Sequence, residues 1–413
     1  MFFVENHFNR FKPLFLFVCL FRQSTTFDYN SYIANIIYKF GGTESYTANL
    51  IEALQRVFPE SRITVVTEHW PETEKLDSSQ LVLRLNEAYG TKLVASGVRM
   101  EYIRSKSQRG RWDTVLFQRQ LHAITREYDL FFYCSRGLLT GKAKKNVAII
   151  HFPMDRKITF PTYQKIPVLK PLAAHTDKEF MAKYDYFFPN SQFTAHWLKE
   201  KWDVPEEKVQ VLYPPVTLIS TPEAMNSKEK NRIFICSRIE KSKKIEDLIQ
   251  AFSSSDYLNK NCSLTVAGSI KNESPEYIAQ LKGINPKVNF VFEPSRQEIE
   301  ELFLKATIFW HAKGFGETDP YQMEHFGITT VEAMSAGCIP VVINKGGQVE
   351  IVTEGCGFKW DTLEELVSFT EQICGGSFDE EKITREAQNR SKDFSKEAFT
   401  NQLRDFFASK NLL

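Results

Sequence analysis

The chain has 413 residues, of which 42% are hydrophobic and 25% are charged, a globular composition in a chain long enough for two domains. The 52 Lys and Arg residues against 51 Asp and Glu residues leave a net charge of +1, which excludes a global field that recruits nucleic acid or a membrane. The seven cysteines lie far apart and include no Cys-x-x-Cys pair, so neither a disulfide framework nor a zinc site is indicated. A reducing compartment fits this cysteine usage best.

An apolar run, PLFLFVCLF, occupies residues 13–21. A membrane-spanning helix needs about 20 apolar residues, so this run is too short to span a bilayer. A signal peptide can be this short, but no small-residue cleavage site follows the run. We predict that the run forms a buried first strand, with a membrane anchor as the alternative.

Helical and extended patterns alternate along the next part of the chain, which is typical of α/β proteins with parallel sheets. Continuous runs of Val, Ile, Leu and Phe in the extended segments favour strands that are covered on both faces. The predicted helices are 44–58, 114–128 and 193–202, and the predicted strands are 63–70, 129–134, 147–152, 184–191 and 209–215.

The periodicity is lost at residues 217–230, where Ser, Thr, Pro, Asn and Lys collect, and this loss indicates a domain boundary. A second alternating series follows, in which Ser295 and Glu298 form a capping box at one helix start. Its predicted strands are 232–238, 263–269, 288–294, 308–313 and 339–347, and its predicted helices are 246–252, 277–284 and 296–306.

We therefore predict an α/β protein built from two doubly wound, Rossmann-like domains that face an interdomain cleft. The first domain is expected at residues 1–222, with an irregular start over 1–30, and the second at 223–392. Residues 393–413 are expected to form a closing helix. Ligands of such domains bind at the carboxyl ends of the strands.

The stretch EHFGITTVEAMSAG, residues 324–337, places two glutamates eight positions apart. A continuous helix would separate Glu324 from Glu332 by about 12 Å and about 80°, too far for joint action on one small group. A helix that begins after Gly327 would leave Glu324 in the preceding loop and Glu332 about one turn into the helix. Both would then surround a helix N-terminus, where free N–H groups and the helix dipole favour anions such as phosphate.

Each of these residues also has a purely structural interpretation. Thr329 and Glu332 have the spacing of a capping box, in which the carboxylate only closes the first helical turn. Glu324 and His325 are compatible with a solvated polar loop.

Basic residues and glycine pairs follow several strands. Arg238 and Lys244, in SRIEKSKK, come after the first strand of the second domain, where cations can reach a bound diphosphate, although such residues are more often only solvated. Gly346 with Gly347, and Gly41 with Gly42, could let the backbone approach a phosphate, although glycine pairs are usually turns. His151 ends a strand before a proline, where a buried, hydrogen-bonded histidine is the plainer interpretation.

Together these motifs resemble the retaining nucleotide-sugar glycosyltransferases of family 4, which have the GT-B fold. The resemblance runs from about residue 35 to the C-terminus and is most specific in the second domain. It rests there on E-x7-E (Glu324 and Glu332) in EHFGITTVEAMSAGCIPVV, on Arg238 with Lys244, and on GGQVEIV from Gly346. In the first domain it rests on FGGTESY, HFP, NSQFT and VLYPPV, and at the end on FSKEAFTNQLRDFF, which is similar to the closing helix that crosses back onto the first domain.

The resemblance implies a role for each candidate residue. Glu332 would hold the ribose hydroxyls of the donor nucleotide, and Glu324 the hydroxyls of the transferred sugar. The backbone amides of Phe326, Gly327 and Ile328 would contact the sugar and the diphosphate. The remaining candidates would also serve the donor: Arg238 and Lys244 would neutralise the leaving diphosphate, Gly346 and Gly347 would bind the donor, Gly41 and Gly42 would border the phosphates, and His151 would approach the reacting carbon.

The implied chemistry needs no protein nucleophile and no cofactor. Preorganised cations and N–H groups at the leaving oxygen would supply much of the catalysis. No Asp-x-Asp pair occurs in the chain, which suits a metal-independent enzyme in which Arg238 and Lys244 replace a divalent ion. In this family the anomeric configuration is retained, and the usual proposal is a front-face attack assisted by the leaving phosphate.

The partners implied are a nucleotide-sugar donor and a glycan or glycolipid acceptor, and no nucleic acid is expected. VLYPPV and EHFGI also occur in mannosyltransferases of lipid-linked oligosaccharide assembly, which slightly favours GDP-mannose over UDP-sugars. The basic run RSKSQRGRW, residues 104–112, could meet anionic lipid headgroups, or could be a solvated loop. We expect a cytoplasmic protein with possible peripheral contact to the membrane.

The N-terminus departs from the family's pattern, because about thirty residues rich in Phe and Asn precede SYIANIIYKFGG, the segment that ends in the first Gly-Gly pair. Either LFLFVCL or YIANIIY, residues 32–38, could be the first strand. The alternative functions are a catalytically degenerate GT-B protein that binds nucleotide sugar or serves as a scaffold, and a GT-B epimerase or phosphorylase-type enzyme. A dehydrogenase is disfavoured because no Gly-x-Gly-x-x-Gly follows a strand.

Overall fold

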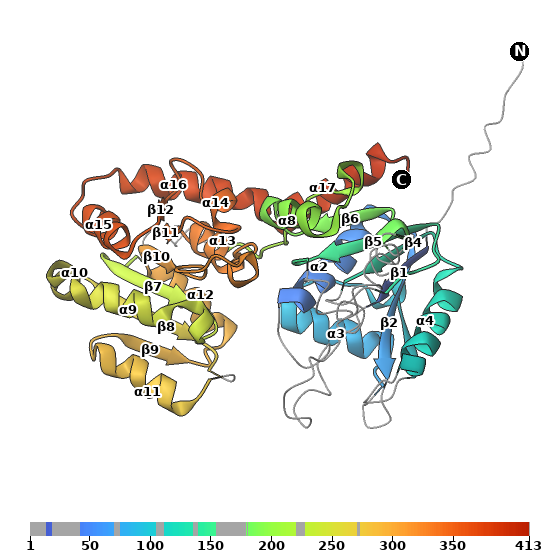
Figure 1. The fold of residues 1–413 in the computed structure, drawn as a ribbon, viewed down its shortest axis with the longest axis horizontal. Helices are drawn as coiled ribbons and strands as arrows, with labels where there is room; N and C mark the ends of the chain where they lie inside the picture. The colour runs from blue at the N-terminus through green and yellow to red at the C-terminus, as the bar shows by residue number, and fades with distance from the viewer. Residues whose placement is uncertain are drawn as a thin grey trace, which may run out of the picture. The chain divides into compact units, whose positions relative to one another are not determined.

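The structure is a computed structural model that describes residues 14–18, 42–69, 75–104, 111–134, 139–153, 179, 181–219, 228–270 and 273–412. The chain divides into two compact units (Figure 1). The first unit comprises Met1–Pro189, Trp197–Leu212 and Thr400–Leu413, and the second comprises Asn190–His196 and Tyr213–Phe399.

The described strands of the first unit form one parallel sheet in the order β3-β2-β1-β4-β5-β6. Leu14–Val18, inside the first apolar run, forms β1 and pairs with both β2 and β4, so the prediction of a first strand there is confirmed. Residues 32–38, the alternative, lie outside the described residues. The other strands are β2 Arg62–His69, β3 Val98–Arg104, β4 Leu130–Tyr133, β5 Lys145–Ile150 and β6 Tyr186–Pro189.

Helices cover both faces of this first sheet. Figure 1 shows α2 and α3 on one face and α4 on the opposite face. Because both faces are covered, every residue of β4 is buried, as the continuous apolar run predicted. The helices are α2 Gly42–Val57, α3 Ser78–Tyr89 and α4 Arg111–Thr125, with the single 3-10 turns η1 Ala95–Gly97 and η3 Glu206–Lys208. A further helix, α8 Gln192–Trp202, begins in the second unit and ends in the first.

The strand predicted at residues 209–215 does not form. The backbone N–H groups of Gln210 and Leu212 donate to the carbonyl oxygens of Phe187 and Pro189 at 3.0 Å each, so the segment begins to pair alongside β6. The pairing stops before the Pro214-Pro215 dipeptide, because proline has no N–H to donate to a ladder. The prediction was wrong because it relied on the apolar residues of this segment and gave too little weight to the two prolines that end it.

The C-terminal helix, α17 Lys396–Ser409, packs two aromatic residues into the first unit. The ring of Phe407 meets the rings of Phe58 at 5.2 Å and Phe132 at 6.4 Å between centroids. The ring of Phe406 meets Tyr186 and Phe188 of β6 at 5.0 and 4.8 Å. These edge-to-face contacts anchor the end of the chain in the core of the first unit.

The strands of the second unit form another parallel sheet, in the order β12-β11-β10-β7-β8-β9. Counted from its own first strand, this order is the same as that of the first sheet. The strands are β7 Arg232–Cys236, β8 Ser263–Gly268, β9 Asn289–Phe292, β10 Ile308–His311, β11 Ile339–Ile343 and β12 Phe358–Trp360.

Side chains of the second sheet alternate between two apolar clusters, as a strand period of two requires. On β7, Ile233 and Ile235 join a cluster with residues of α9, α11 and α15, whereas Phe234 and Cys236 join a cluster with residues of α12 and α13. The helices are α9 Ile245–Ser254, α10 Asp256–Asn261, α11 Pro275–Ile284, α12 Arg296–Lys305, α13 Ile328–Ser335, α14 Gln348–Ile351, α15 Leu363–Cys374 and α16 Glu380–Ser391, with the 3-10 turns η5 Lys241–Lys243, η6 Pro320–Gln322 and η7 Lys392–Phe394.

The strand order of the second sheet reverses between β7 and β10. In open parallel sheets, ligands bind outside the carboxyl ends of the strands at such a switch point. The loops that follow β7, β10 and β11 are therefore the part of the second unit in which a site is expected.

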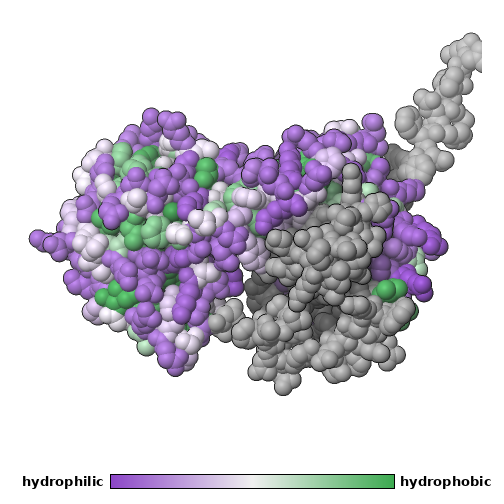
Figure 2. Space-filling view, viewed as in Figure 1, coloured by the Kyte–Doolittle hydropathy of each residue, from purple (hydrophilic) through white to green (hydrophobic). Residues whose placement is uncertain are grey.

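The surface of the second unit is largely hydrophilic on the face that Figure 2 shows, with small hydrophobic spots among the polar residues. Exposed large hydrophobic residues of this unit include Tyr257, Tyr321 and Val349, which are 37%, 43% and 41% exposed. Within the described part of the chain, no helix combines the length and apolar character that crossing a bilayer requires.

Candidate functional site

The loop before α13 provides the first part of the site. The helix has Gly327 as its N-cap, at a φ of 137°, and begins at Ile328. Of the two arrangements considered from the sequence, the one in which the helix begins after Gly327 is therefore present, and Glu324 lies in the preceding loop. The N–H groups of Ile328 and Thr329 have no hydrogen-bond partner among the described residues, so this helix start presents free donors.

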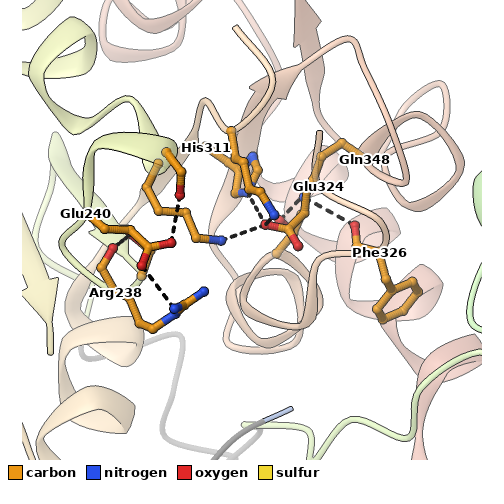
Figure 3. Close-up of polar contacts among 11 residues, drawn as sticks. Arg238, Glu240, His311, Glu324, Phe326 and Gln348 are labelled. Carbon is orange, nitrogen blue, oxygen red and sulfur yellow. Dashed lines mark hydrogen bonds and ion pairs between the residues drawn. The ribbon is translucent and has the colours of Figure 1, made fainter. Parts of the chain in front are cut away.

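The side chain of Phe326 fixes this loop in the core of the second unit. It is 3% exposed and its ring meets those of Tyr213 and Phe394 at 5.9 and 5.4 Å. The carbonyl oxygen of Phe326 accepts a hydrogen bond from Gln348 at 3.4 Å (Figure 3). Phe326 therefore holds this loop in place by its side chain, directly before the helix start at Ile328.

Glu324 lies at the centre of a group of basic side chains. Its Oε2 accepts a hydrogen bond from Lys243 Nζ at 2.8 Å, and it lies 3.4 Å from His311 Nε2 and 4.0 Å from Lys313 Nζ. Figure 3 shows His311 and Glu324 side by side, with the Arg238 and Glu240 pair nearby. Three basic groups therefore surround one carboxylate oxygen of Glu324.

The charges in this group follow from its contacts. Burial would raise the pKa of Glu324, but Lys243, His311 and Lys313 hold that pKa well below its ordinary value. Burial lowers the pKa of His311 despite its bond to Glu324, so the imidazole is neutral at pH 7. Burial also lowers the pKa of Lys313, although Glu324 opposes this effect. Glu324 is thus an anion that is held in place by its neighbours.

The structure brings Lys243, and not Lys244, to Glu324. Lys244 is the N-cap of α9 at a φ of 58°, and its amine pairs with Glu317 at 2.7 Å. Lys243 ends the turn η5, and its side chain is 14% exposed and bonds to Glu324. The apolar spacing of Ile245, Leu248 and Ile249 indicates that the helix starts just after Lys244, but it does not indicate which of the two lysines reaches Glu324.

Arg238 follows β7 and is the more exposed cation of this loop. Its guanidinium pairs with Glu240 at 2.9 Å, and 59% of its side chain is exposed. The positive charge of Arg238 also helps to lower the pKa of Lys313, so the two cations are close enough to repel each other. The predicted residues Arg238 and Glu324 therefore belong to one cluster of charged side chains.

Glu332 has a different partner from the one that the capping-box interpretation predicted. Thr329 lies inside the first turn of α13 rather than at the N-cap, so its hydroxyl cannot cap the helix. The carboxylate of Glu332 is 8% exposed and its Oε1 pairs with Arg296 Nη1 at 2.5 Å. The capping-box interpretation does not hold, because Gly327 takes the cap position. Burial raises the pKa of Glu332, and Arg296 offsets this effect only in part.

Gly346 and Gly347 pack against the loop that carries Glu324. The Gly347 N–H donates to the Glu324 carbonyl oxygen at 2.7 Å. A Cβ at Gly346 would lie 2.3 Å from the Glu324 carbonyl oxygen, and one at Gly347 would lie 2.5 Å from the His325 carbonyl oxygen. The two glycines therefore allow two backbone segments to meet, and they determine where Glu324 is placed.

Gln348 and Glu350 complete this motif, and neither was predicted. Gln348 Oε1 accepts a hydrogen bond from Thr330 Oγ1 at 2.9 Å and so ties α14 to α13. The carboxylate of Glu350 accepts from the backbone N–H groups of Gln192 and Phe193 at 2.8 and 3.0 Å. Glu350 thus caps the start of α8 from a position far along the chain, for which the sequence carries no local signal.

The remaining predicted residues lie in the first unit or outside the described chain. Gly41 lies outside the described residues, and Gly42 is the first residue of α2. His151 follows β5, and its ring meets that of Tyr46 edge to face at 5.5 Å. Of the basic run, Arg104 ends β3 and residues 105–110 lie outside the described residues.

Two family models match the chain in succession. Residues 40–218 match the model described as Glycosyltransferase Family 4, and residues 221–362 match the model described as Glycosyl transferases group 1. The cluster around Glu324 lies within the second of these ranges, and Gly42 and His151 lie within the first.

Two mannosyltransferases are among the characterised relatives. A GDP-Man:Man(3)GlcNAc(2)-PP-Dol alpha-1,2-mannosyltransferase of Dictyostelium discoideum is 24% identical over 234 residues, which cover 52% of this chain and 45% of the relative. The alpha-1,3/1,6-mannosyltransferase ALG2 of Rhizomucor pusillus is 25% identical over 270 residues, which cover 54% of this chain and 58% of the relative. The chain therefore spans about half the length of these relatives.

Solved structures share the fold over nearly the whole chain. A glycosyltransferase from Rickettsia africae ESF-5 superposes with a TM-score of 0.68 at 16% identity and covers 96% of this chain and 98% of that one. Anabaena Alr3699/HepE in complex with UDP-glucose superposes with a TM-score of 0.61 at 16% identity and covers 96% and 100%. The predicted fold class is thereby confirmed as α/β with two parallel Rossmann-like sheets. The chain belongs to the group 1, or family 4, glycosyltransferases of the GT-B fold.

Proposed function

We propose that the chain is a retaining glycosyltransferase that moves a hexosyl group from a nucleotide-diphosphate sugar to a glycan or lipid-linked glycan. The observation that carries the proposal is the cluster around Glu324, in which an anchored carboxylate and two lysines lie at the carboxyl ends of β7 and β10. This is the switch point of the second sheet, beside the free N–H groups of α13.

The donor's diphosphate is the leaving group, and its site must stabilise negative charge. We assign this role to Arg238 and Lys243, with the N–H groups of Ile328 and Thr329, in place of the predicted pair Arg238 and Lys244. Donors of this kind, fixed before the reaction, stabilise the charge that develops on the leaving oxygen. The side chain of Lys243 supports the assignment because its single partner in the described chain, Glu324, leaves further donor capacity on the amine.

The transferred sugar is neutral and needs hydrogen-bond acceptors that can discriminate among its hydroxyl groups. We assign this role to Glu324, which is ionised and can accept from hydroxyl groups. Its Oε2 is held by Lys243 and His311, so the carboxylate is oriented before the sugar arrives. Preorganisation of this kind lowers the entropic cost of positioning the anomeric carbon.

The proposed reaction balances without a protein nucleophile. The bond from the anomeric carbon to the diphosphate oxygen breaks, the acceptor hydroxyl oxygen bonds to the same face of that carbon, and the hydroxyl proton passes to the leaving phosphate. Arg238 and Lys243 would supply the positive charge that a divalent metal supplies in other transferases, so we propose a metal-independent reaction. For Gly41, Gly42 and His151, the roles stated from the sequence stay predictions.

The proposed donor and acceptor are based on the names of the relatives and of the solved structures. The names of the two mannosyltransferases above support GDP-mannose as donor and a lipid-linked glycan as acceptor, and the UDP-glucose complex of the Anabaena protein keeps a UDP-sugar as the competing donor. We therefore propose mannose as the favoured sugar and the cytoplasmic face of a membrane as the place of transfer.

The first test is a calorimetric titration of the full chain with UDP-, GDP- and ADP-sugars, in EDTA and again in magnesium. We expect one nucleotide to bind preferentially and its affinity to be unchanged by EDTA. Lys243→Ala should weaken binding of that nucleotide diphosphate about 10- to 100-fold, because a charge-assisted bond to phosphate is lost.

Lys244→Ala is the matched control, because it removes an adjacent lysine that pairs with Glu317 instead. It should change the affinity by less than about threefold. Equal losses in the two variants would contradict the assignment of Lys243. Absence of binding by any nucleotide sugar would favour a degenerate binding protein or scaffold, and affinity that requires magnesium would contradict the metal-independent reaction.

A further inference from the structure

The contact between Arg296 and Glu332 joins two helices at the edge of the proposed donor site. Arg296 is the first residue of α12, where the positive end of the helix dipole disfavours a cation. Its guanidinium is held by two carboxylates: Nε donates to Glu300 Oε1 at 2.7 Å and Nη1 donates to Glu332 Oε1 at 2.5 Å. The helix dipole does not explain an arginine at this position. Its contact with Glu332 on α13 therefore indicates that Arg296 serves a residue outside its own helix.

The residue that needs Arg296 as a partner is Glu332, whose side chain is only 8% exposed. A buried carboxylate is costly unless it is paired and hydrogen-bonded. Arg296 supplies this partner to one oxygen, Oε1, whereas Oε2 of Glu332 has no hydrogen-bond partner within the described ranges. One oxygen of the carboxylate is thus anchored, and the other keeps its capacity to accept.

We propose that Arg296 is a positioning residue for nucleotide recognition: it anchors Oε1 of Glu332 so that Oε2 accepts the hydroxyl groups of the donor's ribose. The inference rests on the proposed function, in which the nucleotide of a sugar donor binds in the second unit. It adds a residue on α12 to a site whose other members lie on α13 and on the loops after β7, β10 and β11. The consequence is that ribose recognition depends on a side chain that need not touch the ribose.

The charges around Glu332 predict how this role changes with pH. The groups that act on Glu332 are its partner Arg296 and the acidic Glu300, and burial raises the pKa of Glu332 in spite of Arg296. The neighbouring thiol of Cys236 has its pKa raised by burial and by Glu332, so it stays neutral. Loss of Arg296 would raise the pKa of Glu332 further, and the ionised carboxylate would then be lost at a higher pH than in the unchanged chain.

The test compares affinity for two probes in the full chain. The probes are whichever of UDP, GDP and ADP binds most tightly and its 2′,3′-dideoxy counterpart, which lacks both ribose hydroxyls. The unchanged chain should prefer the ribonucleotide by about tenfold or more, the worth of a hydrogen bond to a charged group. In Arg296→Gln this ratio should fall toward one, while affinity for inorganic pyrophosphate, which has no ribose, stays within about twofold.

Two further variants make the result specific to Arg296. Glu300→Gln removes the other carboxylate that contacts Arg296 and should keep the full ratio, because the contact with Glu332 remains. Arg296→Lys keeps a cation but loses the planar guanidinium, so it should retain part of the preference for the ribonucleotide over its dideoxy counterpart. On acidification, this variant should lose the preference at a higher pH than the unchanged chain does.

Each outcome has one meaning. If the unchanged chain does not distinguish the two probes, Glu332 does not bind ribose and the donor site of the proposed function is wrong. If the unchanged chain distinguishes them and both Arg296 variants keep the same ratio and the same pH profile, Arg296 has only a structural role and the inference is overturned. If Arg296→Gln does not fold, as circular dichroism would reveal, Arg296→Lys alone decides by the same two readouts.

Discussion

Glu324 and Glu332 are both enclosed carboxylates, yet their surroundings move their pKa values in opposite directions. Lys243, His311 and Lys313 outweigh burial at Glu324 and lower its pKa, whereas burial outweighs Arg296 at Glu332 and raises it. The difference follows from the number of basic groups that each carboxylate meets. Glu324 is therefore suited to constant ionisation, and Glu332 depends on a single partner for its charge.

His325 provides a prediction for the stability of the chain against acid. Burial, with a contribution from Lys313, lowers the pKa of His325 from 6.5 to about 4. Between these values the unfolded chain binds a proton that the folded chain does not, so the free energy of unfolding falls as the pH falls. We expect His325 to contribute a loss of up to about 1.4 kcal/mol for each pH unit in this range.

Urea unfolding at several pH values between 7 and about 4.5, for the unchanged chain and for His325→Gln, measures this contribution. The glutamine variant should show the shallower pH dependence, because it removes a group whose folded pKa is depressed. The stability that the neutral imidazole contributes is fully present above its unfolded pKa and is lost below it. Parallel curves for the two proteins would show that His325 takes up its proton equally in both states.

At the scale of elements, the glycine pair before α14 determines how closely two loops approach. Gly347 has an ordinary helical φ of −68°, so the backbone itself tolerates alanine there. A Cβ would nevertheless lie 2.5 Å from the His325 carbonyl oxygen and 2.6 Å from the Phe326 Cα, which are backbone atoms that must move. Gly347→Ala should therefore destabilise the second unit by about 1–3 kcal/mol and displace the loop that carries Glu324.

Gly283 is the matched control for this substitution. It lies in α11, and a Cβ there would meet nothing within 4 Å. Gly283→Ala should be neutral or should stabilise by up to about 1 kcal/mol, because alanine favours helix. Chemical denaturation gives both free energies, and the calorimetric titration gives the effect on donor affinity. Equal effects of the two substitutions would contradict the close approach at Gly347.

The helix starts themselves were largely predictable. The capping box of Ser295 and Glu298 at α12 is present as predicted, with the Ser295 hydroxyl and the Glu298 carboxylate each bonded to the other's backbone N–H. The start of α13 after Gly327 is one of the two arrangements that the sequence allowed. The capping box considered for Thr329 and Glu332 is absent, because the helix begins two residues earlier, with Gly327 as its N-cap, and Glu332 pairs with Arg296 on another helix.

At the scale of the whole molecule, the last helix links the end of the chain to the core of the first unit. Phe407 is fully buried, and its ring meets those of Phe58, which directly follows α2, and Phe132 of β4 in edge-to-face contacts. Phe407→Ala should destabilise the first unit by about 3–5 kcal/mol through lost burial and the cavity left behind. Arg404→Ala, whose exposed guanidinium bonds only to Asn401 among the described residues, should stay within about 0.5 kcal/mol.

Hydrogen exchange followed by mass spectrometry distinguishes the two units in this experiment. Amides of β4 and β5 should exchange faster in Phe407→Ala, whereas those of β10 and β11 should be unchanged, because α17 contributes its aromatic residues to the first unit. Faster exchange in β10 and β11 alone would contradict this assignment of the helix.

The sequence alone determined the repeated strand and helix series and the fold class, and it included the first strand at Leu14–Val18 and the start of α13 after Gly327 among the alternatives that it left open. These features depend on apolar periodicity and capping, which act between residues close in the chain. Only the tertiary structure decided that Lys243 rather than Lys244 meets Glu324, and that Arg296 meets Glu332. These choices depend on the direction in which side chains leave their elements and on contacts across 81 and 36 residues of chain, which no local pattern records.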